Sequence, residues 1–134
     1  MTNKESRFQP DVPYSREDIS RIIGGETQSY LPRRSNGNSS KGSIVCCCVS
    51  LEDNPDAPEI VLVGESTDVY QRAVDLCEQG GTFPVFVKDK EQRRTYVGDY
   101  QVAYWSESPK IVAQQRRLSG RENIERVLFL EVAT

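Results

Sequence analysis

The stretch of residues 93–105, RRTYVGDYQVAYW, carries the side chains best suited to bind a flat ligand. It alternates like a strand, and a period of two places one set on a common side: Tyr96, Gly98, Tyr100, Val102 and Tyr104. Tyrosine offers a stacking face and a hydrogen-bonding hydroxyl. Glycine inside a strand often marks a bend or a close approach by a ligand. The pattern indicates a ligand pocket, or alternatively a barrel core with Gly98 at a corner.

The inventory of catalytic side chains is poor because the chain contains no histidine. Histidine is the side chain most used for acid–base work near neutral pH and for binding zinc. The candidates for enzyme chemistry are Glu65, Cys77 and Asp99, and none stands in a recognisable nucleophile–base arrangement. We therefore expect a binding protein rather than an enzyme, with no catalytic residue and no cofactor.

The four cysteines are Cys46, Cys47, Cys48 and Cys77. Three in a row lack the spacing of a secreted disulfide framework, which favours a reducing, cytoplasmic location. In a strand, Cys46 and Cys48 share one face and Cys47 takes the other. A metal at Cys46 and Cys48 would need two more ligands, so we expect buried, reduced thiols and no metal.

The charge distribution allows a local contact with nucleic acid but no general one. The chain has 17 Lys and Arg against 20 Asp and Glu, a net charge of −3. Residues 1–87 hold 8 basic and 13 acidic side chains, whereas residues 88–130 hold 9 basic and 6 acidic ones. Positive charge therefore gathers in the last third, where Arg116, Arg117 and Arg121 are expected to contact phosphates.

The elements that must position these residues begin with a helix over residues 15–23. Ser15 is its expected N-cap, Asp18 takes the capping-box position, and Gly24 can end it. The segment SIVCCCVSL predicts a strand buried on both faces, and residues 59–63 predict another. A second helix, opened by Ser66 or Thr67, ends at Gly80.

The remainder predicts a hairpin, in which TFPVFVKDK and residues 94–105 pair as antiparallel strands. A basic helix over residues 109–118 and a closing strand over residues 126–132 follow. This order lacks the strict alternation of a doubly wound parallel sheet. It predicts an α+β fold: a small, mainly antiparallel, barrel-like curved sheet with about three helices around it.

The length of 134 residues predicts a single domain. Residues 1–13 are polar with two prolines and predict a disordered tail, which leaves residues 14–134 as the domain. Ser, Asn and Gly residues predict a mobile loop at about residues 33–43. No run approaches the ~18 apolar residues of a membrane span, so we expect no membrane partner.

The hairpin resembles one found in PUA-like β-barrels, a group that includes the SRA and EVE domains and modules attached to some restriction endonucleases. The resemblance covers roughly residues 83–132: the strand YVGDYQV follows PVFVK and precedes VLFLEV. It implies a pocket for a flipped or modified base. By position, Tyr96, Tyr100 and Trp105 would be pocket aromatics, and Asp99 or Gln101 would read the edge of the base.

The loop GGETQSYLPRR has chemistry that suits the same ligand. Gln28 and Tyr30 could contact a base, and Arg33 and Arg34 a phosphate; alternatively it is a surface loop with Tyr30 anchored in the core. The sequence thus predicts a binding module for DNA, RNA or a modified nucleotide, in a restriction or defence system with a partner such as a nuclease. The alternative is a protein-interaction or accessory domain with no small ligand.

Overall fold

The computed structural model describes residues 7–34 and 42–133 and contains three helices and five strands in those parts. The helices are α1 (Arg16–Ile23), α2 (Thr67–Gln79) and α3 (Pro109–Ser119). The strands are β1 (Cys47–Ser50), β2 (Ile60–Gly64), β3 (Phe83–Lys88), β4 (Arg94–Ser106) and β5 (Ile124–Val132). They form one sheet in the order β1-β3-β4-β5-β2.

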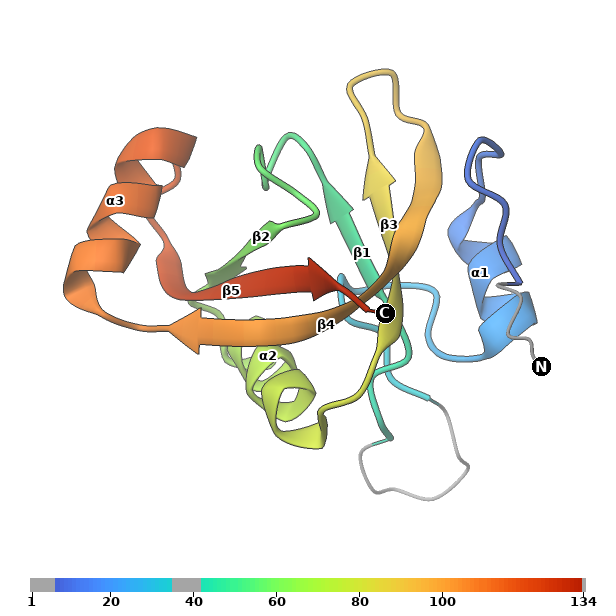
Figure 1. Cartoon of the computed structure of the whole chain (residues 1–134), viewed down its shortest axis with the longest axis horizontal. Coiled ribbons are helices and arrows are strands. Elements are labelled where there is room, and N and C mark those ends of the chain that lie inside the picture. The colour runs from blue at the N-terminus through green and yellow to red at the C-terminus, as the bar shows by residue number, and fades with distance from the viewer. Residues whose placement is uncertain (1–6, 35–41, 134) are drawn as a thin grey trace.

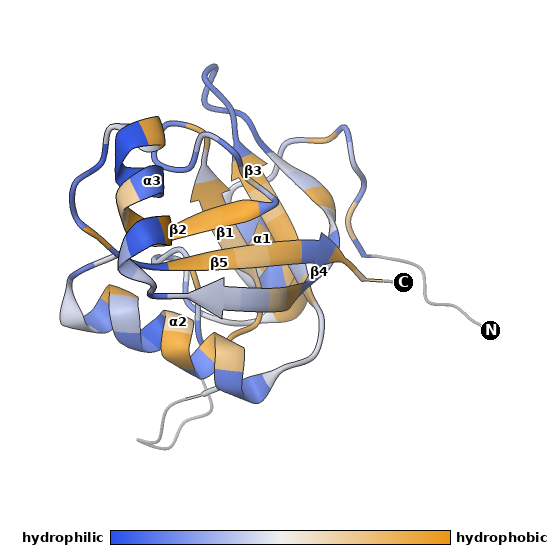
Figure 2. Ribbon diagram, turned by 60° about the vertical axis from the view of Figure 1, so that its left-hand side comes forward, coloured by the Kyte–Doolittle hydropathy of each residue, from blue (hydrophilic) through white to orange (hydrophobic). Residues whose placement is uncertain are grey.

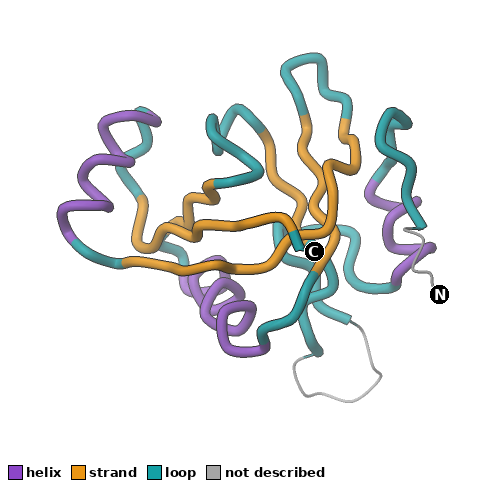
Figure 3. Tube along the Cα trace, viewed as in Figure 1, coloured by secondary structure: helices purple, strands orange, loops and turns teal. Residues whose placement is uncertain are grey.

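The sheet is mixed, curved and open. β1 and β3 are parallel, whereas the β3–β4, β4–β5 and β5–β2 pairs are antiparallel. β4 is long enough to pair with β3 along its first half and with β5 along its second, so the sheet bends along it (Figure 1). Figure 3 shows the same bend in the strand trace. The predicted α+β class with three helices is confirmed, although the sheet does not close into a barrel.

Each helix covers its own cluster of buried apolar side chains. The α2 cluster contains Ala73 and Leu76 of α2 with Cys47, Val85 and Tyr100 of the sheet. The α1 cluster consists of Phe8, Ile19, Val45, Cys46, Cys48 and Phe86. The α3 cluster joins Val112 to Leu62, Ile124 and Val127. Figure 2 shows the result: β1, β2, β3 and β5 are largely apolar, whereas β4 is of intermediate hydropathy and the helices carry both polar and apolar residues.

The chain enters the domain earlier than the expected boundary at residue 14. Phe8 is 4% exposed, and its ring centre lies 4.7 Å from that of Phe86 at right angles to it. It also contacts the ring of Tyr14. The predicted tail therefore does not include Phe8, because an aromatic side chain buries enough apolar surface to hold this segment against the sheet. Residues 1–6 lie outside the described part.

The helix ends follow the predicted chemistry. The hydroxyl of Ser15 accepts a hydrogen bond from the Asp18 N–H, and the Asp18 carboxylate accepts one from the Ser15 N–H, which completes the capping box. At the start of α2 the Ser66 hydroxyl accepts a single hydrogen bond from the Val69 N–H. No helix in the described ranges is long and apolar enough to cross a membrane.

Two bulges divide the tyrosine face of β4. Val85 pairs with Gly98 and Phe86 with Tyr96, so Val97 has no partner on β3 and forms the first bulge. Ala103 forms the second bulge, because it lies between the pairs Val102–Leu130 and Tyr104–Phe129 and has no partner on β5. A one-residue shift moves every later side chain to the opposite face. Tyr96 therefore faces the α1 cluster and Tyr100 the α2 cluster, in contrast to the single face expected from a period of two.

Candidate functional site

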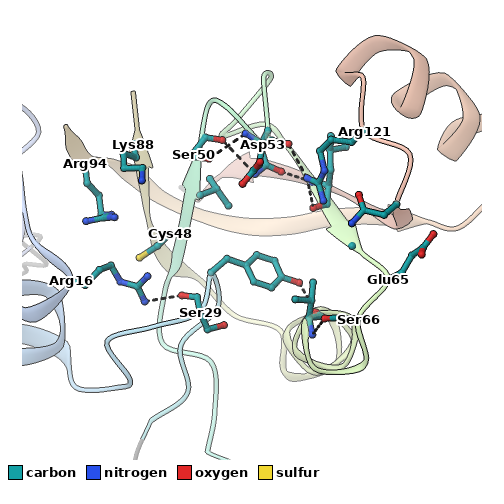
Figure 4. A pocket seen from close by; sticks show the side chains of 17 residues that line it. Arg16, Ser29, Cys48, Ser50, Asp53, Glu65, Ser66, Lys88, Arg94 and Arg121 are labelled. Carbon is teal, nitrogen blue, oxygen red and sulfur yellow. Dashed lines mark hydrogen bonds between the residues drawn. The ribbon is translucent and has the colours of Figure 1, made fainter. Parts of the chain in front are cut away.

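A cavity of about 440 Å³ opens between α1, the strand ends of β1 and β3, and the segment that joins α3 to β5; we call it the Tyr30 cavity. Its polar lining comes from parts of the chain that are far apart in sequence (Figure 4). The side chains used below are Arg16, Ser29, Tyr30, Cys48, Ser50, Asp53, Lys88, Arg94 and Arg121. A volume of this size is typical of small-ligand sites.

One wall of the cavity is a row of polar residues across three strands. Ser50 of β1 pairs with Lys88 of β3, and Lys88 pairs with Arg94 of β4. Arg16 approaches the same wall from α1, where its guanidinium donates a 2.7 Å hydrogen bond to the Ser29 carbonyl. In Figure 4 the three basic side chains lie together on one side of the cavity.

The pair Lys88–Arg94 is electrostatically unfavourable in the protein as described. Like charges directly opposite each other on a sheet destabilise it. Within residues 7–34 and 42–133, no carboxylate forms an ion pair with either side chain. The two cations are partly buried, which weakens screening by solvent. An anion at this wall would relieve the repulsion between them.

The opposite wall is held by Arg121 and by the turn after β1. The Arg121 guanidinium donates a 2.8 Å hydrogen bond to the Asp53 carbonyl and a longer one to the Leu62 carbonyl. Asn54, which is buried, accepts a 2.7 Å hydrogen bond from the Leu62 N–H and so joins this turn to β2. The turn places the exposed Asp53 carboxylate beside Ser50, whose hydroxyl accepts a hydrogen bond from the Asp53 N–H.

The Tyr30 side chain separates this cavity from a second one of about 560 Å³. The second cavity is lined by residues 26–30, which include Gln28, and by the start of α2. The Tyr30 hydroxyl donates a 2.6 Å hydrogen bond to the Val69 carbonyl. Burial against the α2 cluster raises the pKa of the phenol, which therefore stays neutral. The alternative interpretation, in which Tyr30 is anchored against the core, is observed; its contact with a base stays a prediction, and its ring borders the cavity.

The expected pocket residues of β4 lie elsewhere. Tyr100 is 5% exposed within the α2 cluster, and Tyr96 packs on Phe8 and Phe86. The Tyr96 hydroxyl donates to the Asp99 carboxylate. Gly98 has a φ of +134°, a conformation that favours glycine, and a Cβ there would lie 3.3 Å from the Tyr100 ring. None of these residues lines the cavity beside Arg94.

Gln101 and Trp105 border a different cavity, of about 360 Å³, between β4 and α2. The Gln101 amide donates to the Glu131 carboxylate. The Trp105 ring is stacked 3.6 Å from the guanidinium carbon of Arg126, which is buried. The structure thus separates these two residues from the site that Tyr30 borders.

The five arginines expected to contact phosphates also lie at different places in the structure. Arg33 forms a 2.6 Å ion pair with Asp75, and Arg34 borders a separate cavity of about 390 Å³ near the end of α1. Arg116 donates to the Ile124 carbonyl, and Arg117 is exposed on α3. Arg121 alone of the five lines the cavity.

Sequence reasoning missed Arg16, Ser50, Asp53, Lys88 and Arg94. A signal was present in KDKEQRR, where basic residues flank the turn of the hairpin. Cross-strand pairing in that hairpin would have placed Lys88 opposite Arg94. The contributions of Arg16 and Asp53 depend on the tertiary fold and have no local signal.

The cysteines occupy the expected faces, with Cys46 and Cys48 in the α1 cluster and Cys47 in the α2 cluster. All four are free thiols. Within the described residues, no group of three or more cysteine or acidic side chains is placed to hold a metal. The three candidates for enzyme chemistry are dispersed: Glu65 lies on the rim of the Tyr30 cavity, Cys77 borders the Trp105 cavity, and Asp99 accepts from Tyr96.

Three comparisons place the chain among known proteins. A family model described as "Domain of unknown function (DUF6697)" matches residues 13–118. No curated protein is significantly similar in sequence. A crystal structure of the SUVH5 SRA domain in complex with hemimethylated CG DNA aligns with a TM-score of 0.58 and 15% identity, covering 98% of this chain and 91% of that one. The fold is therefore SRA-like and PUA-like, as the hairpin indicated.

Proposed function

The chain belongs to the DUF6697 family, and from its SRA-like fold and the lining of its cavity we propose that it is a DNA-binding module that receives a flipped or modified base in the Tyr30 cavity. The similar SRA domain was crystallised with hemimethylated CG DNA. We extend that ligand class to this chain because its own cavity offers an anion-binding wall and polar groups for a base. RNA is an alternative ligand that the test below distinguishes from DNA.

The observation that carries the proposal is the pairing of Lys88 with Arg94 beside Arg16. Three cations on one wall, none of them in an ion pair with a carboxylate of the described chain, match the phosphates that flank an extruded nucleotide. The net charge of −3 does not oppose this, because phosphate binding needs only local positive potential.

The base would contact the opposite side of the cavity. Readers of flipped bases combine an aromatic or apolar wall with hydrogen bonds to the edge of the base. Tyr30 supplies the aromatic wall, and the Asp53 carboxylate supplies an acceptor for an exocyclic amino group. The Ser50 hydroxyl, at the end of the cationic row next to Asp53, supplies a second acceptor. This assigns the reading of the edge to Asp53, in place of Asp99 or Gln101.

Arg121 joins the proposed site, whereas Arg116 and Arg117 extend it along α3. Arg121 lines the cavity and fixes its wall. Arg116 and Arg117 lie in the last turn of α3, just before it. A duplex seated over the cavity would reach these two arginines with a neighbouring phosphate.

The first experiment measures binding of labelled oligonucleotides by fluorescence anisotropy. The probes are one CG-containing duplex in unmodified and hemimethylated form, its single strands, and the matching RNA. Arg94→Ala should weaken binding to every duplex and reduce the slope of log K against log salt by about one unit. Lys110→Ala is the control, since it removes the same charge from an exposed position of α3 away from the cavity.

A second variant separates reading of the base from binding of phosphate. Asp53→Asn should weaken binding of both duplexes by a similar factor, because methylated and unmodified cytosine carry the same amino group. It should leave the salt slope unchanged, because Arg121 bonds the backbone of this residue and not its side chain. Absence of binding to every oligonucleotide would reject the proposed function.

An accessory domain that binds a protein, such as a nuclease in a defence system, is the second candidate. It is favoured by apolar side chains exposed on β4 and β5, of which Tyr104 is 52% and Val132 58% exposed. Exposed aromatic residues are enriched at protein interfaces. Substituting Tyr104 with Ser should impair capture of that partner and leave oligonucleotide binding unchanged.

A further inference from the structure

Two cysteines on one face of the chain meet beside the cationic wall of the cavity. The Sγ atoms of Cys46 and Cys48 are 3.9 Å apart. Residues separated by two positions in an extended chain have Cα atoms about 6.5 Å apart, at the upper end of the range that a disulfide spans. A disulfide also needs Cβ atoms about 3.8 Å apart, so forming the S–S bond takes a local shift of this segment as well as rotation of the two side chains.

The two thiols differ in their surroundings. Cys48 is 7% exposed and lines the cavity, whereas Cys46 has no exposed surface. Figure 4 shows the Cys48 sulfur between the side chains of Arg16 and Arg94. A small polar oxidant that enters the cavity thus reaches Cys48 first.

The electrostatics agree with this order. The hydrogen bond with Cys46 lowers the pKa of Cys48, and the positive charges of Arg16 and Arg94 act in the same direction against the effect of burial. The same hydrogen bond, together with burial, raises the pKa of Cys46. A thiolate flanked by cations is the form of cysteine that reacts with peroxides.

We propose that Cys48 and Cys46 form a peroxide-sensitive dithiol, in which Cys48 is the attacking residue and Cys46 the resolving one. The Cys48 thiolate attacks one peroxide oxygen; the S–O bond forms, the O–O bond breaks, and the hydroxide that leaves takes the proton that Cys48 lost on ionisation and becomes water. The Cys46 sulfur then attacks the Cys48 sulfur; the S–S bond forms, the S–O bond breaks, and the released hydroxide takes the Cys46 proton as water. Two thiols and one hydrogen peroxide thus give one disulfide and two waters.

Cys47 and Cys77 provide matched controls within the same chain. Cys47 is next to both reacting residues but faces the α2 cluster, and burial raises its pKa. Cys77 is more exposed than the other three but borders the Trp105 cavity. If exposure or sequence proximity decided reactivity, Cys77 or Cys47 would be oxidised instead.

The experiment treats the reduced, folded protein with hydrogen peroxide, blocks remaining thiols under denaturing conditions, and maps them by mass spectrometry. We expect a loss of two hydrogens from the peptide that holds residues 46–48, with Cys77 fully alkylated. Cys47→Ala should still form the bond, which assigns it to the two outer cysteines. Cys46→Ala should stop at a sulfenic acid on Cys48 that a dimedone probe captures, and Cys48→Ala should leave Cys46 unmodified.

The wild-type result keeps the test decisive if a variant fails to fold. A bond that includes Cys47 or Cys77, or a peptide 46–48 that is oxidised only after unfolding, would overturn the proposal. The readout is sulfur chemistry alone, so its outcome is independent of whether the protein binds DNA.

Discussion

The Arg121 guanidinium donates a 2.8 Å hydrogen bond to the backbone carbonyl of Asp53. The contact joins the segment between α3 and β5 to the turn after β1, 68 residues earlier in the chain. Because the bond goes to the backbone, it fixes the position of Asp53 and leaves the carboxylate available to a ligand. Arg121 thus acts as a support of the cavity wall, whatever further contact it makes with a phosphate.

Replacing Arg121 should cost stability as well as binding. Arg121→Ala removes two hydrogen bonds from a charged donor, of which the second is long, and we expect a loss of about 1–2 kcal/mol in the free energy of unfolding. Arg117→Ala removes the same charge from an exposed site on α3 and should change stability by less than about 0.5 kcal/mol. Urea unfolding of both variants checks this, and equal stabilities would contradict the supporting role.

Tyr100 should behave as a core residue. Tyr100→Ala removes a buried ring from the α2 cluster and should cost about 3–5 kcal/mol. Tyr100→Phe keeps the ring and should retain both stability and oligonucleotide binding. A folded Tyr100→Phe protein that no longer binds DNA would return this residue to the binding site.

At Tyr30, the hydroxyl should contribute to stability and the ring should contribute to ligand binding. Tyr30→Phe loses the hydrogen bond to the Val69 carbonyl, which we expect to cost about 1 kcal/mol of stability, while the ring still borders the cavity. Tyr30→Leu keeps apolar bulk but removes the stacking surface, and should weaken binding by roughly 1–3 kcal/mol. Thermal melts and anisotropy on the same samples separate the two effects; equal affinity in both variants would exclude stacking on Tyr30.

The sequence predicted the elements well because their signals are local. The helix predicted over residues 15–23 is observed at Arg16–Ile23, and the strand over residues 94–105 at Arg94–Ser106. Ser15, Asp18 and Gly24 specify that helix through contacts within one turn of it.

The candidate site could not be predicted in the same way. A period of two assigns Tyr96 and Tyr100 to one face, and it fails because Val97 bulges in a ladder whose register depends on β3. The parallel pairing of β1 with β3, which places Ser50 beside Lys88, depends on tertiary packing and has no signal in either segment. The cavity was missed for the same reason, since its walls come from segments that meet only in the folded chain.

The cluster around Arg126 should make stability depend on acid pH. Hydrogen bonds from Tyr70 and Arg126 to the Glu107 carboxylate lower the pKa of Glu107 from its ordinary value near 4.5, in spite of some burial. A carboxyl group whose pKa is lower in the folded state contributes stability at pH values above 4.5, and that contribution is lost as the pH falls through the folded-state pKa. Glu107→Gln keeps a hydrogen-bond acceptor but does not titrate, so its stability deficit relative to the wild type should shrink below about pH 4.5. Because the Glu107 side chain is 37% exposed, solvent screening should keep the effect below about 1 kcal/mol.

Glu125→Gln, at an exposed position of β5, is the control and should leave the acid dependence unchanged. Urea unfolding between pH 3 and 7 measures all three proteins, and a Glu107→Gln deficit that stays constant over this range would show that the carboxylate contributes no pH-dependent stability.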